Sequence, residues 1–385
     1  MSPQMFLDEK QTASNRTPRQ INRNLIFHQI RTMQPISRAD LARASGLQRS
    51  TVSLIVEELL AERWIVEGWI GESPRGRKPT VLLLNRMRGV LALDVHPAQT
   101  TLAVADLSGK ILDETRLALP DDPQKVISAI LGAIRKTITT HRERSFEGIG
   151  ITLPGRFSHQ LKRTVFAPNV KWPIAQIESR VEKATGLPVV VDNVANACAL
   201  SEMWFGHSDP SHDLVVINVS EGIGTGIYAN GRLLRGQVDA AGEFGHVQLD
   251  RNGPPCGCGS RGCWETFASN RAALRYYDEL SGSPAPSIER IVQLAETGDK
   301  TANKAIQRMS SALGRGMHMI VSALAPNEIV VVGELTRLWP VVFPIVDAEL
   351  RKFPLISVPT LRTADEPEKA RLRSAVALVM NGKLI

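Results

Sequence analysis

A group of cysteines near the middle of the chain is the strongest chemical signal in the sequence. Cys256, Cys258 and Cys263 lie within eight residues, and His246 lies ten residues before the first of them. Three thiolates and one imidazole form a tetrahedral ligand set typical of Zn²⁺, and a closed set of four leaves no position for an activated water. The spacing therefore predicts a structural zinc site, and the alternative is a chance cluster of free thiols.

The other cysteine, Cys198, lies alone on an expected helix and is interpreted as a small core residue. Four cysteines among 385 residues are too few for a secreted protein held by disulfides. No apolar run approaches the ~20 residues that cross a bilayer, and the polar N-terminus has no signal-peptide core. We therefore expect a cytoplasmic protein that does not bind membranes.

Basic charge is concentrated near the N-terminus. Residues 1–88 contain 14 Lys and Arg against 8 Asp and Glu, whereas the rest of the chain contains 32 against 31. A local surplus of this kind is typical of a polyanion-binding module attached to a neutral body. A solubilising surface is the alternative, and charge alone does not separate the two.

The N-terminal segment has the pattern of three short helices. Residues 1–20 are polar and are expected to be flexible. Apolar residues then recur at helical spacing over 21–33, and Ser37 has the position of an N-cap for a second helix over 37–44. A third helix is expected from about Gln48, after a turn that contains glycine. This arrangement predicts a helix-turn-helix.

Two expected strands, at 64–69 and 80–84, flank a basic loop and make residues 21–85 a winged helix-turn-helix domain. The third helix would read the major groove of double-stranded operator DNA, and the extended Arg-Gly-Arg of the loop would fit a minor groove. The candidate DNA contacts are Arg38, Gln48, Arg49, Ser50, Thr51, Ser53, Arg75, Arg77 and Lys78.

A second domain is expected over 88–385. A strand–turn–strand pattern at 90–119 recurs at 214–233, where residues 221–226 read as a glycine-rich turn. The repetition predicts a duplicated α/β body with two lobes and a ligand cleft between them. The first expected lobe covers about 88–193 together with a C-terminal helix over about 367–385. The second expected lobe covers about 194–366.

The cysteines lie within a longer motif, Ala241-Gly-Glu-Phe-Gly-His246 followed by Gly253-Pro-Pro-Cys-Gly-Cys-Gly-Ser-Arg-Gly-Cys-Trp-Glu265. This motif resembles the signature of the ROK family, which comprises sugar kinases of the actin/hexokinase-like (ribonuclease H-like) fold and repressors related to them. The N-terminal domain is similar to that of the repressor branch. The resemblance extends from about residue 21 to the end of the chain, and its cysteine motif is specific to the family.

The resemblance implies a sugar site beside the zinc loop. Glu243 and Glu265 match carboxylates that accept hydrogen bonds from sugar hydroxyls, and His246 matches a residue that serves both zinc and sugar. Asn193 matches another sugar contact, and the loop Leu153-Pro-Gly155 resembles one whose backbone lines the pocket. Carboxylates and amides suit a polyol, because each can bind paired hydroxyl groups. The implied effector is a sugar or a sugar derivative.

The elements that match the kinases' catalytic and nucleotide-binding parts depart from the family pattern. Val194 occupies the position of the catalytic aspartate, and an isopropyl group cannot accept a proton. His96 and Pro97 replace glycines of the first phosphate loop. Glu221 brings a negative charge to the second phosphate loop, and Glu334 replaces a glycine near the adenosine end. We therefore expect no catalytic residue and no kinase activity.

Together these features predict a DNA-binding transcriptional regulator, a repressor, whose larger domain senses a sugar. Helix-turn-helix proteins usually read palindromes, so a homodimer or homotetramer is expected. Two alternatives remain open. One is an active sugar kinase that kept a DNA-binding domain, and the other is a regulator controlled by a protein partner instead of free sugar.

Overall fold

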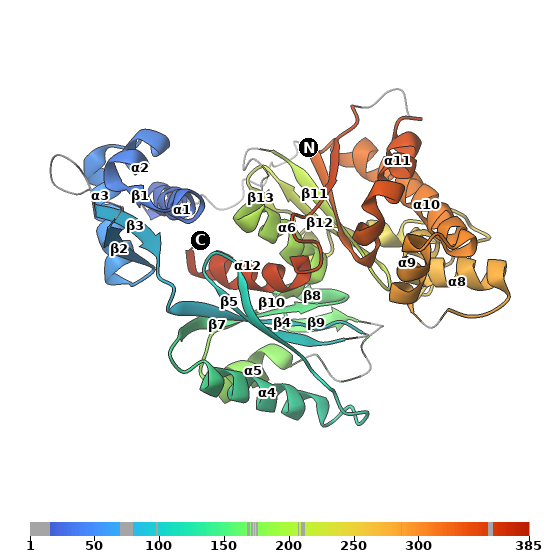
Figure 1. Cartoon of the computed structure of the whole chain (residues 1–385), viewed down its shortest axis with the longest axis horizontal. Coiled ribbons are helices and arrows are strands. Elements are labelled where there is room, and N and C mark those ends of the chain that lie inside the picture. Colours follow the sequence, from blue (N-terminus) through green and yellow to red (C-terminus); the bar gives the residue numbers. More distant parts are fainter. Residues whose placement is uncertain are drawn as a thin grey trace, which may run out of the picture. The chain divides into compact units, whose positions relative to one another are not determined.

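The computed structural model divides into two compact units, Met1–Arg88 with Met380–Ile385, and Gly89–Val379. Figure 1 labels the helices and strands of both. Within the described part of the chain, no helix is long and apolar enough to cross a membrane. The described residues are 16–69, 80–97, 99–167, 170, 172, 174, 176–206, 208, 212–285, 287–352 and 357–384.

The first unit contains three helices and an antiparallel sheet of order β1-β3-β2. Its core forms because apolar side chains recur on one face of each helix: Ile26 and Ile30 of the first, Leu41 of the second and Val52 of the third have no exposed surface. The elements are α1 (Arg16–Met33), β1 (Ile36–Ser37), α2 (Arg38–Ser45), α3 (Arg49–Ala61), β2 (Ile65–Trp69) and β3 (Thr80–Leu84).

The ends of these helices follow local chemistry. The hydroxyl of Ser37 accepts a hydrogen bond from the amide of Asp40 at 3.2 Å, which confirms the expected N-cap of α2. Gly46 ends α2 in the left-handed region, with φ of 69°. The expected flexible segment 1–20 is wrong at its end, because residues 16–20 belong to α1. Arg19 pairs there with Glu58 of α3.

The second unit begins with a five-stranded sheet of order β10-β7-β4-β5-β6. Figure 1 shows α4 and α5 on one face of this sheet and α12 on the other. Gly150 of β7 allows the close approach of α12, since an added Cβ would lie 1.8 Å from the carbonyl oxygen of Ala375. The elements are β4 (Arg88–Asp94), β5 (Thr101–Asp106), β6 (Ile111–Arg116), α4 (Val126–Thr140), β7 (Ser145–Leu153), β8 (Arg156–Ser158), β9 (Arg163–Phe166), α5 (Ile177–Thr185) and β10 (Val189–Asn193).

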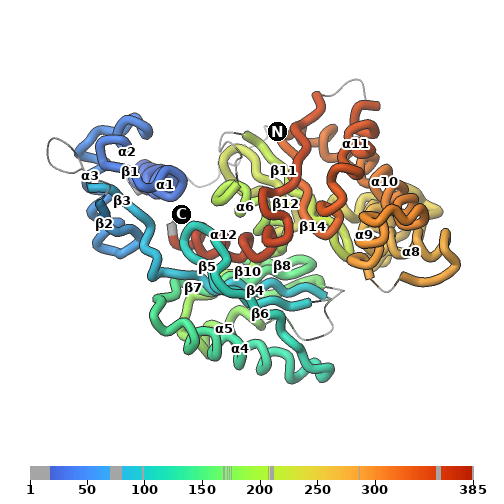
Figure 2. Tube along the Cα trace, in the orientation of Figure 1, coloured from blue at the N-terminus to red at the C-terminus, as the bar shows by residue number. Residues whose placement is uncertain are grey.

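A second five-stranded sheet has the order β13-β12-β11-β14-β15. Helices α8 to α11 gather around a large apolar core beside it (Figure 2). The elements are α6 (Val194–Phe205), β11 (Leu214–Val219), β12 (Ile223–Ala229), β13 (Arg232–Leu233), η1 (Gln237–Asp239), η2 (Glu243–His246), α7 (Glu265–Ala268), α8 (Asn270–Ser281), α9 (Ile288–Glu296), α10 (Lys300–Leu324), β14 (Glu328–Gly333), η3 (Glu334–Leu338), α11 (Trp339–Leu350), β15 (Thr360–Thr363) and α12 (Ala370–Leu384).

The two sheets repeat one topology. In each sheet the first strand along the chain lies in the centre. The second and then the third strand lie on one side of it, and the fourth and then the fifth lie on the other. Strands β10 and β7 are parallel, as are β11 and β14, whereas β4 with β5 and β11 with β12 are antiparallel. The expected duplication of an α/β unit is therefore present in the fold.

The expected glycine-rich turn over 221–226 is wrong in extent. Strand β12 begins at Ile223, and Gly226 pairs with Val216 of β11. The turn is thus confined to Glu221 and Gly222. Gly226 serves a close approach, because an added Cβ would lie 2.1 Å from the carbonyl oxygen of Ala195 in α6. A glycine that packs a helix onto a strand looks the same in sequence as a glycine in a turn.

A glycine substitution tests the core of the second unit. Gly316→Ala would place a Cβ 2.0 Å from the ring of Trp264, which has no exposed surface and whose Nε1 donates to the Ala312 carbonyl at 3.0 Å. We expect a destabilisation of about 1–3 kcal/mol, measured as a lower midpoint of urea unfolding. The matched control is Gly132→Ala in α4, which has nothing within 4 Å of the added Cβ and should stabilise by about 0.5–1 kcal/mol. An unchanged midpoint for Gly316→Ala would contradict this packing.

Candidate functional site

The four expected metal ligands come together in the structure. One donor atom from each of His246, Cys256, Cys258 and Cys263 lies within 4.8 Å of all the others. Nδ1 of His246 is 3.5 Å from Sγ of Cys256, and Sγ of Cys258 is 3.7 Å from Sγ of Cys263. Thiolates and imidazole at such separations suit one tetrahedral ion. The cluster could therefore hold a metal ion.

A tight loop positions these thiols. Cys263 is fully buried and pairs with Gln248 through an isolated β-bridge. Gly262, just before it, has φ of 65°, and an added Cβ would lie 1.5 Å from the carbonyl oxygen of Asp250. Only glycine fits this turn, which explains the residue directly before the last cysteine.

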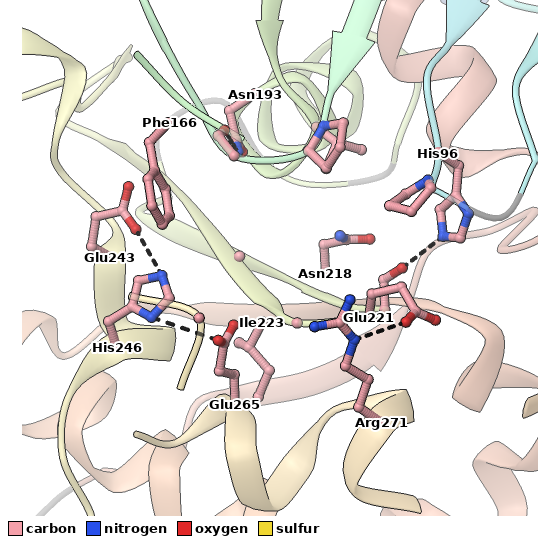
Figure 3. Close-up of a pocket in the computed structure, with 18 of the residues that line it drawn as sticks. His96, Phe166, Asn193, Asn218, Glu221, Ile223, Glu243, His246, Glu265 and Arg271 are labelled. Carbon is pink, nitrogen blue, oxygen red and sulfur yellow. Dashed lines mark hydrogen bonds and ion pairs between the residues drawn. The ribbon is translucent and has the colours of Figure 1, made fainter. Parts of the chain in front are cut away.

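The four residues implied as sugar ligands line one cavity of about 100 Å³ beside this cluster (Figure 3). Asn193 comes from the end of β10, Glu243 and His246 from η2, and Glu265 from the start of α7. Nε2 of His246 lies 3.8 Å from Oε2 of Glu243, while Nδ1 lies 3.7 Å from Oε1 of Glu265. A metal bound through Nδ1 would leave Nε2 as a donor toward the cavity.

Asn193 also has a local role that the sequence did not predict. Its Oδ1 accepts a hydrogen bond from the amide of Ala195 at 2.7 Å and so caps α6. Its Nδ2 donates to the carbonyl of Gly155. The side chain thereby ties the loop over residues 153–155 to the start of α6, at the wall of the cavity.

No carboxylate occupies position 194 in this cavity. Val194 lines it, with only 3% of its surface exposed. Asp192, two residues earlier, is fully buried, and its Oδ2 accepts a hydrogen bond from Nη2 of Arg235 at 2.7 Å. Its carboxylate is therefore held by an ion pair in the protein interior.

Ion pairs lie at the end of the cavity near His96 and Arg371. Arg371 donates from Nε to Oδ2 of Asp94 at 2.8 Å and from Nη2 to Oδ1 at 3.0 Å. Burial alone would lower the pKa of Arg371, but the charge of Asp94 outweighs it and holds this pKa above its ordinary value. This bidentate pair joins β4 to α12.

His96 and Glu221 have partners of their own. Nε2 of His96 is 2.8 Å from the hydroxyl of Ser220 and 3.8 Å from Oε1 of Glu334. Burial, and then the charge of Arg371, lower the pKa of His96, which favours a neutral imidazole. The carboxylate of Glu221 accepts a hydrogen bond from Nε of Arg271 at 3.1 Å (Figure 3).

Sequence reasoning missed several residues of this cavity, among them Arg371, Arg271 and Asn218. The side chain of Asn218 points toward the middle of the cavity in Figure 3, and its buried Oδ1 has no hydrogen-bond partner. One signal was available, because Asn218 interrupts the apolar strand Leu214–Val219. Arg371 carried no such signal, since its partner Asp94 is 277 positions away.

The structure describes six of the nine expected DNA contacts. Gln48, Arg49 and Ser50 are exposed at the start of α3, and Thr51 and Ser53 are half-buried just behind them. Arg38 pairs with Glu67 of β2, with Nη1 3.1 Å from Oε1. Arg75, Arg77 and Lys78 lie outside the described residues.

A family model for the ROK family matches residues 90–381. The chain belongs to the ROK family. A xylose repressor from Bacillus subtilis is 32% identical over 336 residues, which cover 86% of this chain and 87% of that protein. A glucokinase from Streptomyces coelicolor is 30% identical over 262 residues, which cover 64% of this chain and 82% of the kinase.

A solved structure extends the similarity to nearly the whole ROK chain. It is a ROK family transcriptional regulator described as a homologue of the Escherichia coli MLC protein, with a TM-score of 0.76 and 28% identity. The match covers 94% of this ROK chain and 96% of the regulator. The hexokinase-like α/β fold of the second unit is thus shared with the family.

Replacement of one thiol tests the metal cluster. Cys258 is exposed, so Cys258→Ser removes a ligand with little loss of packing. We expect the metal content measured by emission spectrometry to fall from about one ion per chain to near zero, with a lower thermal midpoint. The control is Cys198→Ser, because Cys198 is buried away from the cluster and burial raises the pKa of its thiol to about 12. Equal metal content in both variants would exclude the cluster.

Proposed function

We propose that this ROK protein is a DNA-binding transcriptional repressor, located in the cytoplasm, whose second unit binds a sugar or sugar derivative and does not phosphorylate it. One observation carries the proposal. The cavity that joins Asn193, Glu243, His246 and Glu265 has a valine at position 194. At its other end lie a buried ion pair, Arg371 with Asp94, and a more exposed one, Arg271 with Glu221. Such a site suits a polyol, but it has no carboxylate at position 194, and arginine–carboxylate pairs lie where ATP phosphates would be expected.

The first unit would be a winged helix-turn-helix, with α3 as the recognition helix and the loop between β2 and β3 as the wing. The exposed side chains at the start of α3 are short or forked hydrogen-bonding groups, which suit base edges and phosphates in a major groove. The similarity to a xylose repressor and to a ROK regulator supports this interpretation. Such domains usually bind palindromic operators, so we propose a homodimer or homotetramer.

The sugar would act by changing the relative angle of the two lobes of the second unit. A ligand can do this only if it binds the two arrangements with different affinity. The linker at residues 85–89 would pass the change to the DNA-binding domain. In the absence of the sugar the protein would occupy its operator, and the sugar would release it.

The ion held by the cysteine cluster would be a structural Zn²⁺. The donor set Cys₃His is complete with four ligands and has no open position for a reacting water. Its role would be to hold the loop that carries His246 and precedes Glu265. The metal would thus help to position the residues that bind the sugar. Of these residues, only His246 would contact the ion itself.

The DNA-binding proposal is tested with DNA from upstream of the protein's own gene. Arg49→Ala should weaken binding to this DNA by about 1–3 kcal/mol if the side chain contacts base edges, measured by fluorescence anisotropy at fixed salt. Arg135→Ala, an exposed arginine of α4 in the second unit, is the charge-matched control and should change nothing. An equal loss on random DNA would make Arg49 a phosphate contact, and no loss on either DNA would remove it from the interface.

The sugar-sensing proposal is tested at Glu243. Loss of a charged acceptor should weaken sugar binding about 10- to 100-fold in Glu243→Ala, because hydrogen bonds to charged groups contribute about 1.5–3 kcal/mol. Operator affinity without sugar should stay unchanged. Glu289→Ala, an exposed carboxylate of α9, is the control. Release from DNA by the same sugar concentration in wild type and Glu243→Ala would count against this cavity.

The similarity to a glucokinase keeps an active kinase as the second candidate. Incubation with ATP, Mg²⁺ and a panel of hexoses and pentoses separates the two functions. Sugar phosphate formed above background would establish the kinase and end the proposal of a non-catalytic sensor. If no sugar gives heat in calorimetry and a transporter subunit is recovered on the immobilised protein, control by a protein partner replaces control by free sugar.

A further inference from the structure

A second cavity adjoins the proposed sugar cavity. It has a volume of about 440 Å³, compared with about 100 Å³ for the first. His96, Pro97 and Arg271 line both, so the two spaces meet at these side chains. The larger space therefore extends from the end of the first cavity at which His96 and Arg271 lie.

The walls of this second cavity have the chemistry of a carbohydrate site. Trp172 is half-buried and presents an aromatic surface, and Leu119 adds an apolar one. Gln99 and Asp121 supply an amide and a carboxylate that can bind hydroxyl groups. An aromatic face carries partial negative charge and attracts the C–H hydrogens of a sugar ring. An apolar platform with a few polar groups around it is typical of a small-molecule site.

Among the described residues, two buried polar atoms at these cavities have no hydrogen-bond partner. Thr100 lines the second cavity with 2% of its surface exposed, and its Oγ1 has no hydrogen-bond partner. Asn218 lines the first with 5% exposed, and its Oδ1 is also without one. Buried polar groups are nearly always hydrogen-bonded in folded proteins, because an unpaired one loses its hydration without compensation. In this structure both atoms are covered, so a ligand with hydroxyl groups in both spaces would supply the missing partners once these two side chains rotate toward it.

The charges between the cavities disfavour a phosphorylated ligand. Glu221 already pairs with Arg271, and Asp94 with Arg371. Glu334, close to His96, adds a negative charge to this region, and Asp121 adds another in the second cavity. A phosphate would add negative charge to a region where these four carboxylates already face two arginines. A neutral polyol adds no such charge.

We propose that the effector is a neutral oligosaccharide or glycoside, with one ring in the proposed sugar cavity and the next ring beside Trp172 in the second cavity. This inference rests on the proposed sugar-sensing function and extends it to the class of sugar. Thr100 and Asn218 would bind hydroxyl groups on the two sides of the junction. Trp172 would determine the preference for a second ring.

Calorimetry with matched sugars tests the inference. The pairs are D-xylose with xylobiose, D-glucose with cellobiose or maltose, and N-acetylglucosamine with its β-1,4-linked disaccharide. At least one disaccharide should bind about 10-fold or more tightly than its monosaccharide. Trp172→Leu should remove this difference while leaving monosaccharide affinity within about twofold, and Trp172→Phe should retain most of it.

Thr100→Val is the second variant, because it keeps the shape of the side chain and removes only the hydroxyl. It should weaken binding of the disaccharide about 3- to 10-fold and leave the affinity for the monosaccharide unchanged. The thermal unfolding midpoint of the protein without ligand should not fall. A midpoint that falls would show that the hydroxyl serves the fold.

The outcomes separate the two proposals. If monosaccharides bind and release the DNA, but no disaccharide binds more tightly, the second-ring inference is overturned and the sensor remains. Disaccharide preference that survives Trp172→Leu also overturns it, since the second ring must then lie elsewhere. If no sugar of the panel binds, both the inference and the sugar-sensing function fail.

Discussion

The two nitrogens of one imidazole connect the chemistry of this protein. Nδ1 of His246 faces the thiol of Cys256, and Nε2 faces the carboxylate of Glu243 in the cavity. The ring can satisfy both only in one orientation. Glu265 begins α7 two residues after Cys263, and between them lies Trp264, whose ring is packed against α10. Trp264 and Glu265 therefore connect the cysteine loop to a large apolar core of the second unit and to the cavity.

The opposite end of the cavity is organised by charge. Kinases need this end open, so that phosphate oxygens meet backbone amides and a bound cation. In this chain Arg371 and Arg271 are committed to Asp94 and Glu221. The Arg371–Asp94 pair is largely buried, so breaking it would leave an uncompensated charge, whereas the side chain of Arg271 is about half exposed.

Much of the fold was predictable from the sequence, because its elements follow local rules. The cap at Ser37, the strand Thr80–Leu84 and the strand Leu214–Val219 need only neighbouring residues and apolar periodicity. The metal cluster was predictable because its donors are close in sequence and chemically distinctive. The extent of the turn at 221–226 was not predictable, because Gly226 is required by the close approach of Ala195, which belongs to another element. The start of α1 at Arg16 was also missed, because residues 16–20 are polar and have no apolar face in the sequence.

The sequence by itself determined the composition of the site: a Cys₃His set, acidic and amide side chains suited to a polyol, and a valine where a base would be required. These are statements about side-chain types, and they hold in any fold that brings the residues together. Only the tertiary structure decided which groups are already engaged with one another. It paired Asp94 with Arg371 across 277 positions, buried Asp192 against Arg235 and left Oδ1 of Asn218 without a hydrogen-bond partner among the described residues. The physical reason is that a charge or hydrogen bond acts over a few ångströms of space, whatever the number of residues that separates its ends along the chain.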